Sequence, residues 1–416
     1  MNIFRVFIET VAPLKKRNVS LFLGGQVVSQ FGSMLQGTAL SWVVWEFSKS
    51  TEALGITNML HYLPYLLFGP FAGVLADRLS RRGILLGLQA AEMALALLFA
   101  FLLQADSVSL WHIYLFSFLS GCILGIDSPV GAAYLGDLAG KKRVREAVAL
   151  NNVILQAART AAPAAAGILL AAVNSSRIFF INGAASLFIF AALLMISFRP
   201  LKNPLSAAGG EKFIDALRFI KGRAQIQDLI IASMCITFFS GGVSNLVPAV
   251  VTERLHAGPE ALGFITAAFG AGPLIGAILI VPFFQKIKKP GTALLLSLAW
   301  MGAWFAAAAF SGSVWLWIVG MFAANLSNPA VLVIAAGLIQ FLTPEQMYGR
   351  VMGIWMMLTF GMMPFGPLVS GFLSSGVGIA PAILIFAFTL ILAAALMALF
   401  RGDFRRWLPH EENRAV

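Results

Sequence analysis

Residues 378–400 read GIAPAILIFAFTLILAAALMALF, a run without a single charged side chain. A helix that crosses the hydrocarbon core of a bilayer needs about 20 consecutive apolar residues, so this run is long enough. Comparable runs recur along the whole chain, near 19–45, 53–76, 83–105, 110–135, 147–173, 177–199, 226–252, 261–284, 290–310, 314–342 and 350–375. The sequence therefore predicts an all-α membrane protein with twelve transmembrane helices.

The composition argues against other classes of protein. Hydrophobic residues make up 59% of the 416 positions and charged residues 11%, whereas soluble domains carry about 25% charged residues. The net charge of +11 does not indicate nucleic-acid binding, because the basic residues lie in short loops between apolar runs. The two cysteines lie inside apolar runs and the four histidines lack ligand spacing, so no disulfide and no metal site are expected.

The distribution of basic residues predicts the orientation in the membrane. The loops on one side of the predicted bundle hold only Lys49, Arg177 and Arg254, and nearly all other lysines and arginines fall on the other side. Cytoplasmic loops of membrane proteins are enriched in lysine and arginine. We therefore expect both termini in the cytoplasm and a multi-pass protein of the bacterial cytoplasmic (inner) membrane.

The predicted spans fall into two six-helix bundles. The expected parts are a cytoplasmic N-terminal segment (1–18), an N-terminal bundle (19–199), a cytoplasmic central loop (200–225), a C-terminal bundle (226–400) and a cytoplasmic tail (401–416). In the central loop, Phe213, Leu217 and Ile220 recur at helical spacing among basic residues. This loop is either a solvated linker or an amphipathic helix that lies on anionic lipid.

The two bundles are also related in sequence. The tetrapeptide EALG at 52–55 recurs at 260–263, an offset of 208 (260 minus 52). Pro163 and Gly167 match Pro367 and Gly371 at an offset of 204 (367 minus 163). Two parallel repeats that rock about a shared central site give alternating access. The four matched residues, Pro163, Gly167, Pro367 and Gly371, are therefore candidate hinge positions.

Residues 73–82 read GVLADRLSRR. The arginines set orientation, but Gly73 and Asp77 need another explanation, such as close helix approach and a carboxylate at a helix N-terminus. The segment resembles the G-x-x-x-D-R-x-G-R-R loop of the major facilitator superfamily, with Ser80 in place of the second glycine. In that superfamily the loop is a cytoplasmic latch between two halves. The resemblance implies a conformational latch formed by Gly73, Asp77, Arg78, Arg81 and Arg82.

The fifth span contains ARTAAPAAAG at 158–167. It resembles the A-R-x-x-G-P-x-x-x-G pattern of one branch of the superfamily, the enterobactin-exporter-like and macrolide-efflux-like transporters, with Ala162 where glycine is usual. The motifs ALG at 53–55, DSP at 127–129 and RVMG at 350–353 also fit this branch. The resemblance implies efflux of a small organic molecule.

Four ionisable residues lie well inside predicted spans, away from the span ends, where such groups are costly and mark functional sites. Arg159 is either an anion-binding or proton-coupling group, or a structural arginine. Glu92 can carry a proton during transport, or it can face a water-filled crevice or pair with Arg159. Asp127 is a coupling acid or a conformational or capping acid near the loop. His61 is a titrating group or a satisfied packing residue.

Uncharged polar residues are candidates to line a substrate cavity. They are Gln26, Gln30, Ser33 and Gln36 of the first span, Gln156 of the fifth, Ser244 of the seventh, and Asn325 and Asn328 of the tenth. The alternative is hydrogen bonding between helices alone.

The sequence offers no catalytic dyad and no nucleotide-binding loop, so we expect a transporter and not an enzyme. The predicted function is secondary-active efflux of a siderophore-like or drug-like molecule by proton antiport, a type of activity that confers multidrug resistance. The proton motive force would drive it, without a cofactor. The alternatives are uptake of a metabolite and lysophospholipid translocation. The expected partners are a small-molecule substrate and the lipid bilayer, with no nucleic acid, and the chain is expected to function as a monomer.

Overall fold

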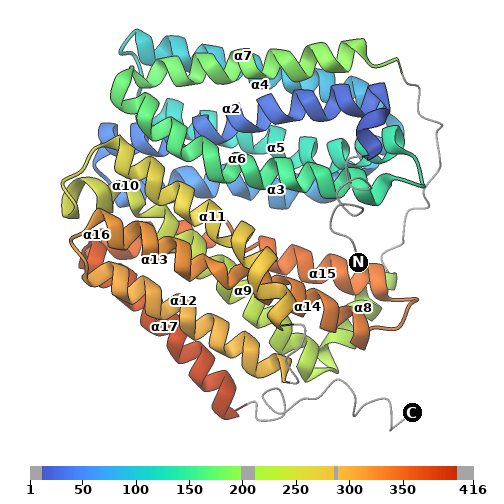
Figure 1. Ribbon diagram of the computed structural model, residues 1–416, viewed down its shortest axis with the longest axis vertical. Helices are drawn as coiled ribbons and strands as arrows, with labels where there is room; N and C mark the ends of the chain where they lie inside the picture. The colour runs from blue at the N-terminus through green and yellow to red at the C-terminus, as the bar shows by residue number, and fades with distance from the viewer. Residues whose placement is uncertain (1–11, 198–210, 285–288, 401–416) are drawn as a thin grey trace. The chain divides into compact units, whose positions relative to one another are not determined.

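The computed structural model describes residues 12–197, 211–284 and 289–400, without the side chains of residues 69–78, 211–213 and 282–284. Every regular element in these ranges is a helix (Figure 1). In chain order they are η1 (Ala12–Lys15), α2 (Arg17–Ser48), α3 (Thr51–Arg78), α4 (Arg81–Gln104), α5 (Leu110–Ala139), α6 (Val144–Ala172), α7 (Ser175–Met195), α8 (Glu211–Lys221), α9 (Ala224–Asn245), α10 (Val247–Ala249), η2 (Val250–Arg254), α11 (Pro259–Phe284), α12 (Pro290–Phe310), α13 (Val314–Leu326), α14 (Asn328–Leu342), α15 (Tyr348–Phe360), α16 (Phe365–Val377) and α17 (Ile379–Phe400).

Ten helical rods in the described residues are long and apolar enough to cross a membrane. Three of them join several elements: α9 to η2 (Ala224–Arg254), α13 and α14 (Val314–Leu342), and α15 and α16 (Tyr348–Val377). Helices α2 and α3 add two more rods of 32 and 28 residues, roughly 48 and 42 Å at 1.5 Å per residue. Helix α2 is less apolar because glutamines and serines line it. These twelve rods correspond in order to the twelve predicted spans.

Three rods of the C-terminal half are interrupted, and a proline lies at each interruption. Helix α9 ends before Pro248, α13 and α14 meet before Pro329, and α16 begins after Pro364. Proline lacks a backbone N–H and its ring clashes with the preceding turn, which favours a break at these positions, although α11 continues through Pro273. In the N-terminal half, α5 and α6 continue through Pro129 and Pro163.

The chain forms two compact units. Unit 1 comprises residues 1–49, 60–206 and 257–267, and unit 2 comprises residues 50–59, 207–256 and 268–416. Each unit is mainly one of the predicted bundles. However, the start of α3 belongs with the C-terminal helices and the start of α11 with the N-terminal ones. The two units therefore do not follow chain order at these two helix ends, and the predicted domain boundaries stay a prediction.

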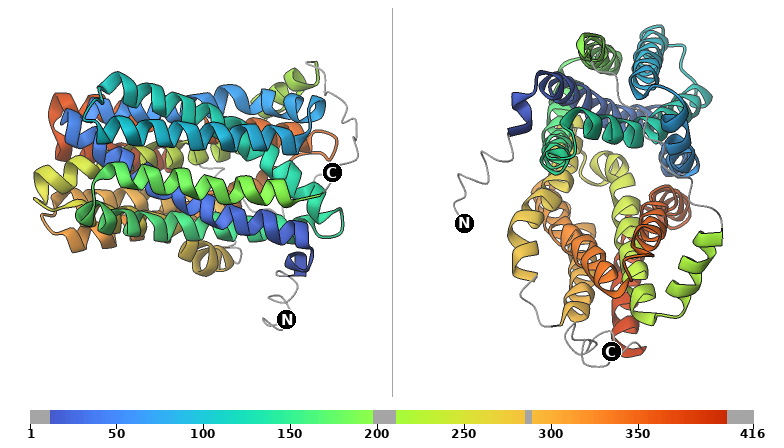
Figure 2. Two further views of the ribbon diagram at one scale, coloured as in Figure 1. Left: turned by 90° about the horizontal axis from the view of Figure 1, so that it is seen from above. Right: turned by 90° about the vertical axis from the view of Figure 1, so that its right-hand side faces the viewer.

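The core of unit 1 holds together the helices that carry the candidate site. Helices α2 and α4 both lie along α7 (Figure 2). Buried side chains from α2, α4, α5 and α7 meet there, among them Phe22, Leu85, Tyr134 and Leu193. The rings of Phe22 and Tyr134 pack edge to face with centroids 5.6 Å apart. This apolar contact fixes the four helices beside the polar side chains described below.

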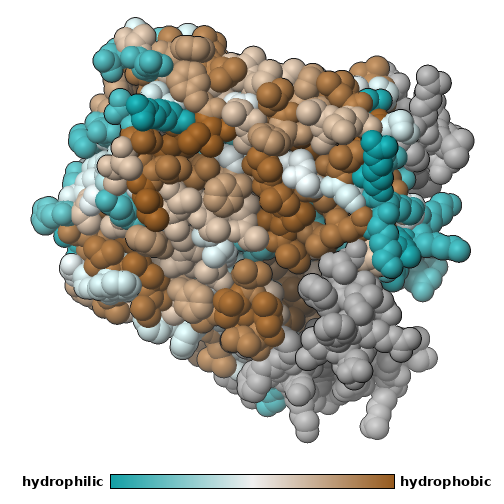
Figure 3. Space-filling model, turned by 45° about the horizontal axis from the view of Figure 1, so that its top comes forward, coloured by the Kyte–Doolittle hydropathy of each residue, from teal (hydrophilic) through white to brown (hydrophobic). Residues whose placement is uncertain are grey.

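The surface is consistent with a bilayer environment. On the face shown in Figure 3, hydrophobic residues cover most of the central area and hydrophilic residues gather toward opposite edges.

The helix predicted in the central loop is present as α8. It buries Ala216 and Ile220 but exposes Ile214 and Leu217, and the Gln227 side-chain amide donates to its last carbonyl groups. Its placement on anionic lipid stays a prediction.

Candidate functional site: a carboxylate cluster in the N-terminal half

Glu92 lies in a polar cluster formed by three helices of unit 1. Its Oε1 atom is 3.5 Å from Nε2 of Gln36 on α2 and 3.5 Å from Nδ2 of Asn182 on α7. The same Asn182 nitrogen donates to Oε1 of Gln36 over 2.8 Å. Asn182 is fully buried and Gln36 is nearly so. The carboxyl group of the half-buried Glu92 is therefore held by the buried side-chain amides of two neighbouring helices.

A second carboxyl group joins this cluster from α5. Asp127 Oδ1 accepts a hydrogen bond of 3.1 Å from Nε2 of Gln89, which lies one helical turn before Glu92 on α4. Oε1 of Gln89 and Oδ1 of Asn182 are buried and have no hydrogen-bond partner in the described part of the chain. The cluster thus combines two carboxyl groups with acceptor atoms that can receive a further proton donor.

The structure corrects one expectation for Glu92 and one for Asp127. Glu92 does not pair with Arg159. Its partners are amides, and Arg159 is an exposed side chain on α6 for which the described residues provide no ion pair. Asp127 does not cap a helix end, because it lies inside α5 and bonds Gln89. Sequence spacing alone could not choose between these partners, which come from different helices.

His61 on α3 is placed as a packing residue. Its ring meets that of Tyr62 edge to face, with centroids 4.9 Å apart. Gly121 on α5 packs directly against the His61 backbone. These contacts support the packing interpretation of this histidine.

The predicted latch is described only in part. The side chains of Gly73, Asp77 and Arg78 lie outside the described residues, so their role stays a prediction. Arg82 donates to the carbonyl oxygens of Leu193 (2.7 Å) and Leu194 (2.8 Å) in the last turn of α7. A cation there satisfies free carbonyl groups and the negative end of the helix dipole.

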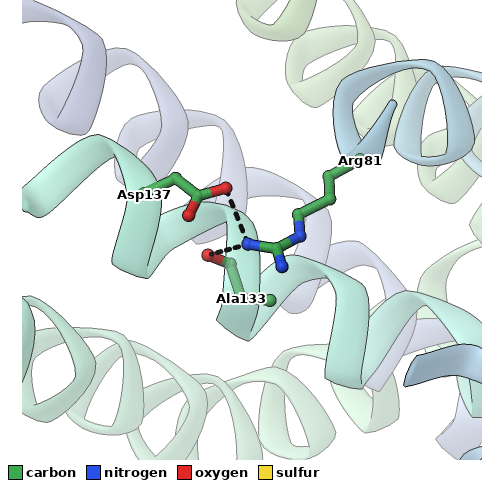
Figure 4. A network of polar contacts seen from close by, with 3 residues as sticks. All are labelled: Arg81, Ala133 and Asp137. Carbon is green, nitrogen blue, oxygen red and sulfur yellow. Dashed lines mark hydrogen bonds and ion pairs between the residues drawn. The ribbon is translucent and has the colours of Figure 1, made fainter. Parts of the chain in front are cut away.

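Arg81 forms an ion pair that the sequence did not reveal. Its Nη1 atom lies 2.7 Å from Oδ2 of Asp137 near the end of α5, and 3.5 Å from the Ala133 carbonyl oxygen (Figure 4). Asp137 could have been noticed in the sequence, because it is an acidic residue in a region that otherwise carries positive charge. Ser80 also has a role, because its hydroxyl accepts from the Gly83 N–H and caps α4. This explains serine where the resembled loop has glycine.

We predict that Arg81→Gln and Asp137→Asn each destabilise the protein by about 1–3 kcal/mol, because both partners are largely buried, with 19% and 25% of their side chains exposed. The double variant should lose less than the sum of the single losses. Unfolding of the purified protein in mixed micelles measures this. Asp215→Asn, in an exposed pair 4.0 Å from Arg218, is the control and should change little. Additive losses would contradict the prediction.

The polar residues of the first span are divided between the cluster and local contacts. Gln36 belongs to the cluster, while Gln30 donates to Gln26 over 3.3 Å. Ser33 is half-buried. On α6, Gln156 is half-buried and its backbone carbonyl accepts from Thr160. Only Gln36 is thus brought to the carboxyl groups.

In the C-terminal half, Asn325 is fully buried between helices. Its Oδ1 accepts from the Ser240 hydroxyl over 2.9 Å and its Nδ2 donates to the Met321 carbonyl. These bonds support interhelical hydrogen bonding for Asn325. Ser244 and Asn328 are half-buried, and their role as cavity residues stays a prediction.

The candidate hinge residues form two matching helix crossings. In unit 1, a Cβ atom placed on Gly167 would lie 2.6 Å from the Pro259 carbonyl oxygen, and one on Gly263 would lie 2.6 Å from that of Pro163. This is the α6–α11 crossing. Glycine is required here because the two backbones nearly touch.

The α3–α16 crossing in unit 2 uses the equivalent residues. A Cβ atom on Gly55 would lie 2.7 Å from the Pro367 carbonyl oxygen, and Gly371 lies against the Thr51 carbonyl. The predicted repeat pairs these residues with those of the first crossing. The α3–α16 crossing also carries hydrogen bonds: Thr51 donates to the Gly371 carbonyl (2.9 Å) and Ser375 to Glu52 (2.6 Å). Asn58 of α3 also donates to Asn245 of α9 (2.8 Å), which in turn donates to the Pro367 carbonyl of α16 (3.2 Å). Such bonds are not found at α6–α11 in the described residues.

Comparison with known proteins bears on the two matched helix crossings and on the half-buried carboxyl groups. The model of the transmembrane secretion effector family matches residues 8–409. The chain belongs to this family. Relatives include an uncharacterised MFS-type transporter, YfiS, of Bacillus subtilis (25% identical, 96% of this chain and 98% of that one). Macrolide efflux protein A of Streptococcus pyogenes is 21% identical over 92% and 95%, and the enterobactin exporter EntS of Citrobacter koseri is 23% identical over 90% and 89%.

The solved structures agree on the fold of this family member. A bacterial homologue of the human lysosomal transporter Spinster, in an inward-facing and unoccupied conformation, superposes with a TM-score of 0.73 at 15% identity, over 95% of this chain and 99% of that one. The predicted major facilitator fold and exporter-like branch are thereby confirmed, as is the prediction of a transporter and not an enzyme.

Proposed function

We propose that this family member exports a small organic molecule, siderophore-like or drug-like, across the bacterial cytoplasmic membrane in exchange for protons. Alternating access of the two bundles would move the molecule, and both termini would lie in the cytoplasm. Exporters of enterobactin and of macrolides among its relatives support efflux. The observation that carries proton coupling is that two carboxyl groups inside spans of the N-terminal half, those of Glu92 and Asp127, are each held by side-chain amides.

The position of the acidic residues supports coupling in the N-terminal half. Between residues 224 and 400 the sequence has four carboxylate side chains: Asp228, Glu253, Glu260 and Glu345. The first three lie near the ends of their rods and the fourth lies between α14 and α15. Glu92 and Asp127 instead lie inside α4 and α5. Carboxyl groups well inside a span, away from its ends, and able to carry protons are therefore offered by the N-terminal half.

The available energy is adequate for this exchange. One charge that crosses a potential of 100 mV provides about 2.3 kcal/mol. A tenfold concentration ratio of substrate costs about 1.4 kcal/mol. One proton per cycle is therefore enough to maintain a useful outward gradient.

Purified protein in liposomes provides the test. Radiolabelled erythromycin and a labelled catecholate siderophore serve as probes, and a proton gradient of either sign is imposed. Export by antiport predicts that flux reverses with the sign of the gradient. Flux that never responds to the gradient would exclude antiport. Label in intact cells then separates directions, because an exporter lowers intracellular label and an importer raises it.

A further inference from the structure

Helix α6 exposes two faces of opposite character. One carries Val153, Ala157 and Ile168, which are all exposed and apolar. The other carries Asn152, Gln156 and Arg159, spaced four and three residues apart and therefore on one side of the helix. Asn152 and Arg159 are exposed and Gln156 is half-buried. An apolar face suits lipid, whereas a face with two polar side chains and an arginine suits water.

The polar face becomes buried farther along the helix. Pro163 and Gly167 continue the same side of α6, and both are buried where the α6–α11 crossing forms. By the predicted orientation, α6 runs from the cytoplasm outward. The polar face is therefore exposed from its cytoplasmic end as far as Arg159, and it is buried one turn later, from Pro163 onward. Arg159 lies at the inner boundary of this closed crossing.

Arg159 has a permanent charge and no described counter-ion. A guanidinium group does not lose its proton under physiological conditions. The two carboxyl groups of the same half are held by Gln36, Asn182 and Gln89. Within residues 12–197, 211–284 and 289–400, no ion pair or hydrogen bond to the Arg159 side chain is found among the described side chains. A cation near the middle of a span, exposed on a polar face, is available to bind an anion.

We propose that Arg159 binds an anionic group of the exported molecule, with Gln156 as an adjoining hydrogen-bond donor. The planar guanidinium matches two oxygens that share a negative charge, as in a carboxylate or a phosphate ester. The substrates are then organic anions that enter from the cytoplasmic end. This inference rests on the proposed export function and adds the chemical class of the substrate.

The first experiment tests whether the polar face of α6 is accessible to water. In protein with Cys122→Ala and Cys235→Ala, single cysteines are introduced as Gln156→Cys and, on the apolar face, Val153→Cys. N-ethylmaleimide reacts with a thiolate, which requires water. We expect position 156 to react at least about tenfold faster than position 153, although Val153 is more than half exposed (55%). Equal rates would overturn the assignment of the two faces.

The second experiment tests recognition of the anion. 1-Naphthoate, 1-naphthyl phosphate and the neutral 1-naphthamide are added as protectants during alkylation of the cysteine at position 156. Hydrogen bonds to charged groups are typically strong enough that Arg159→Gln should weaken protection by the anions about tenfold to a hundredfold. Protection by the amide should not change. Arg159→Lys, which retains the charge, should restore part of the anion effect.

The outcomes separate this inference from the proposed export function. If neither anion protects better than the amide, or if Arg159→Gln leaves anion protection unchanged in folded protein, the assignment of Arg159 is overturned. Proton-independent flux in liposomes would instead exclude antiport and leave anion protection intact. Size-exclusion elution and thermal unfolding of each variant confirm that it is folded.

Discussion

Glu92→Gln should abolish the ability of a proton gradient to drive transport while leaving substrate exchange intact. The amide has nearly the shape of the carboxyl group, so the bonds with Gln36 and Asn182 can be retained, but it cannot release a proton. A gradient of one pH unit is worth about 1.4 kcal/mol per proton and can hold a tenfold substrate ratio. In liposomes the variant should hold none, and counterflow with equal substrate on both sides should continue.

Glu46→Gln provides a matched control for that experiment. Glu46 is an exposed carboxylate near the end of α2, so its neutralisation should leave the tenfold ratio unchanged. Asp127→Asn neutralises the other carboxyl group of the cluster, which contacts Gln89 and not the partners of Glu92. Comparison of the two variants therefore distinguishes the two carboxyl groups. If Glu92→Gln still supports an uphill gradient, the cluster is structural and coupling lies elsewhere.

Gly167→Ala is expected to separate the α6–α11 crossing. The added methyl group would lie 2.6 Å from the Pro259 carbonyl oxygen and 2.8 Å from the Gly263 Cα atom, and backbone atoms cannot move aside as a flexible side chain can. Overpacking of this kind costs about 1–3 kcal/mol, which shifts the population of the closed crossing by roughly 5- to 150-fold. Turnover should fall because the cycle is held away from this state.

Spin labels at Asn174→Cys and Glu260→Cys measure the crossing directly, since both positions are exposed and belong to unit 1. Gly167→Ala should add a population at longer distance in double electron–electron resonance. Gly37→Ala is the control, because a Cβ atom there meets nothing within 4 Å. An unchanged distance distribution and unchanged turnover in Gly167→Ala would refute a role for the crossing.

The twelve spans could be predicted from sequence because each depends on a local property, the length of an apolar run. Residues 290–310 and 314–342 agree with the structure to the residue. The interruptions at Pro248 and Pro364 were not predicted. Proline is tolerated within a membrane helix when neighbours satisfy the freed backbone groups, and the neighbours of a helix are not a local property.

The candidate site was predicted less completely for the same reason. Glu92 and Asp127 stand out in sequence because each is an acid within an apolar run. Their hydrogen-bond partners are Gln36, Gln89 and Asn182. The five side chains come from four helices, α2, α4, α5 and α7, so spacing along the sequence could not identify these contacts. Pairing of Glu92 with Arg159 was a reasonable expectation from charge alone, but α2 and α4 both pack against α7, and the amides of Gln36 and Asn182 contact Glu92 instead.

The equivalent pairing of Gly55 with Pro367 and of Gly263 with Pro163 has an evolutionary consequence. It is the contact that two identical six-helix subunits would make twice in a twofold-symmetric homodimer, once on each side of the axis. In such a dimer a single mutation alters both copies at once. In a single chain the two copies can change separately, and the Thr51 hydroxyl stabilises the α3–α16 copy alone. A single chain can thus evolve one strong and one weak crossing, which a symmetric dimer cannot do.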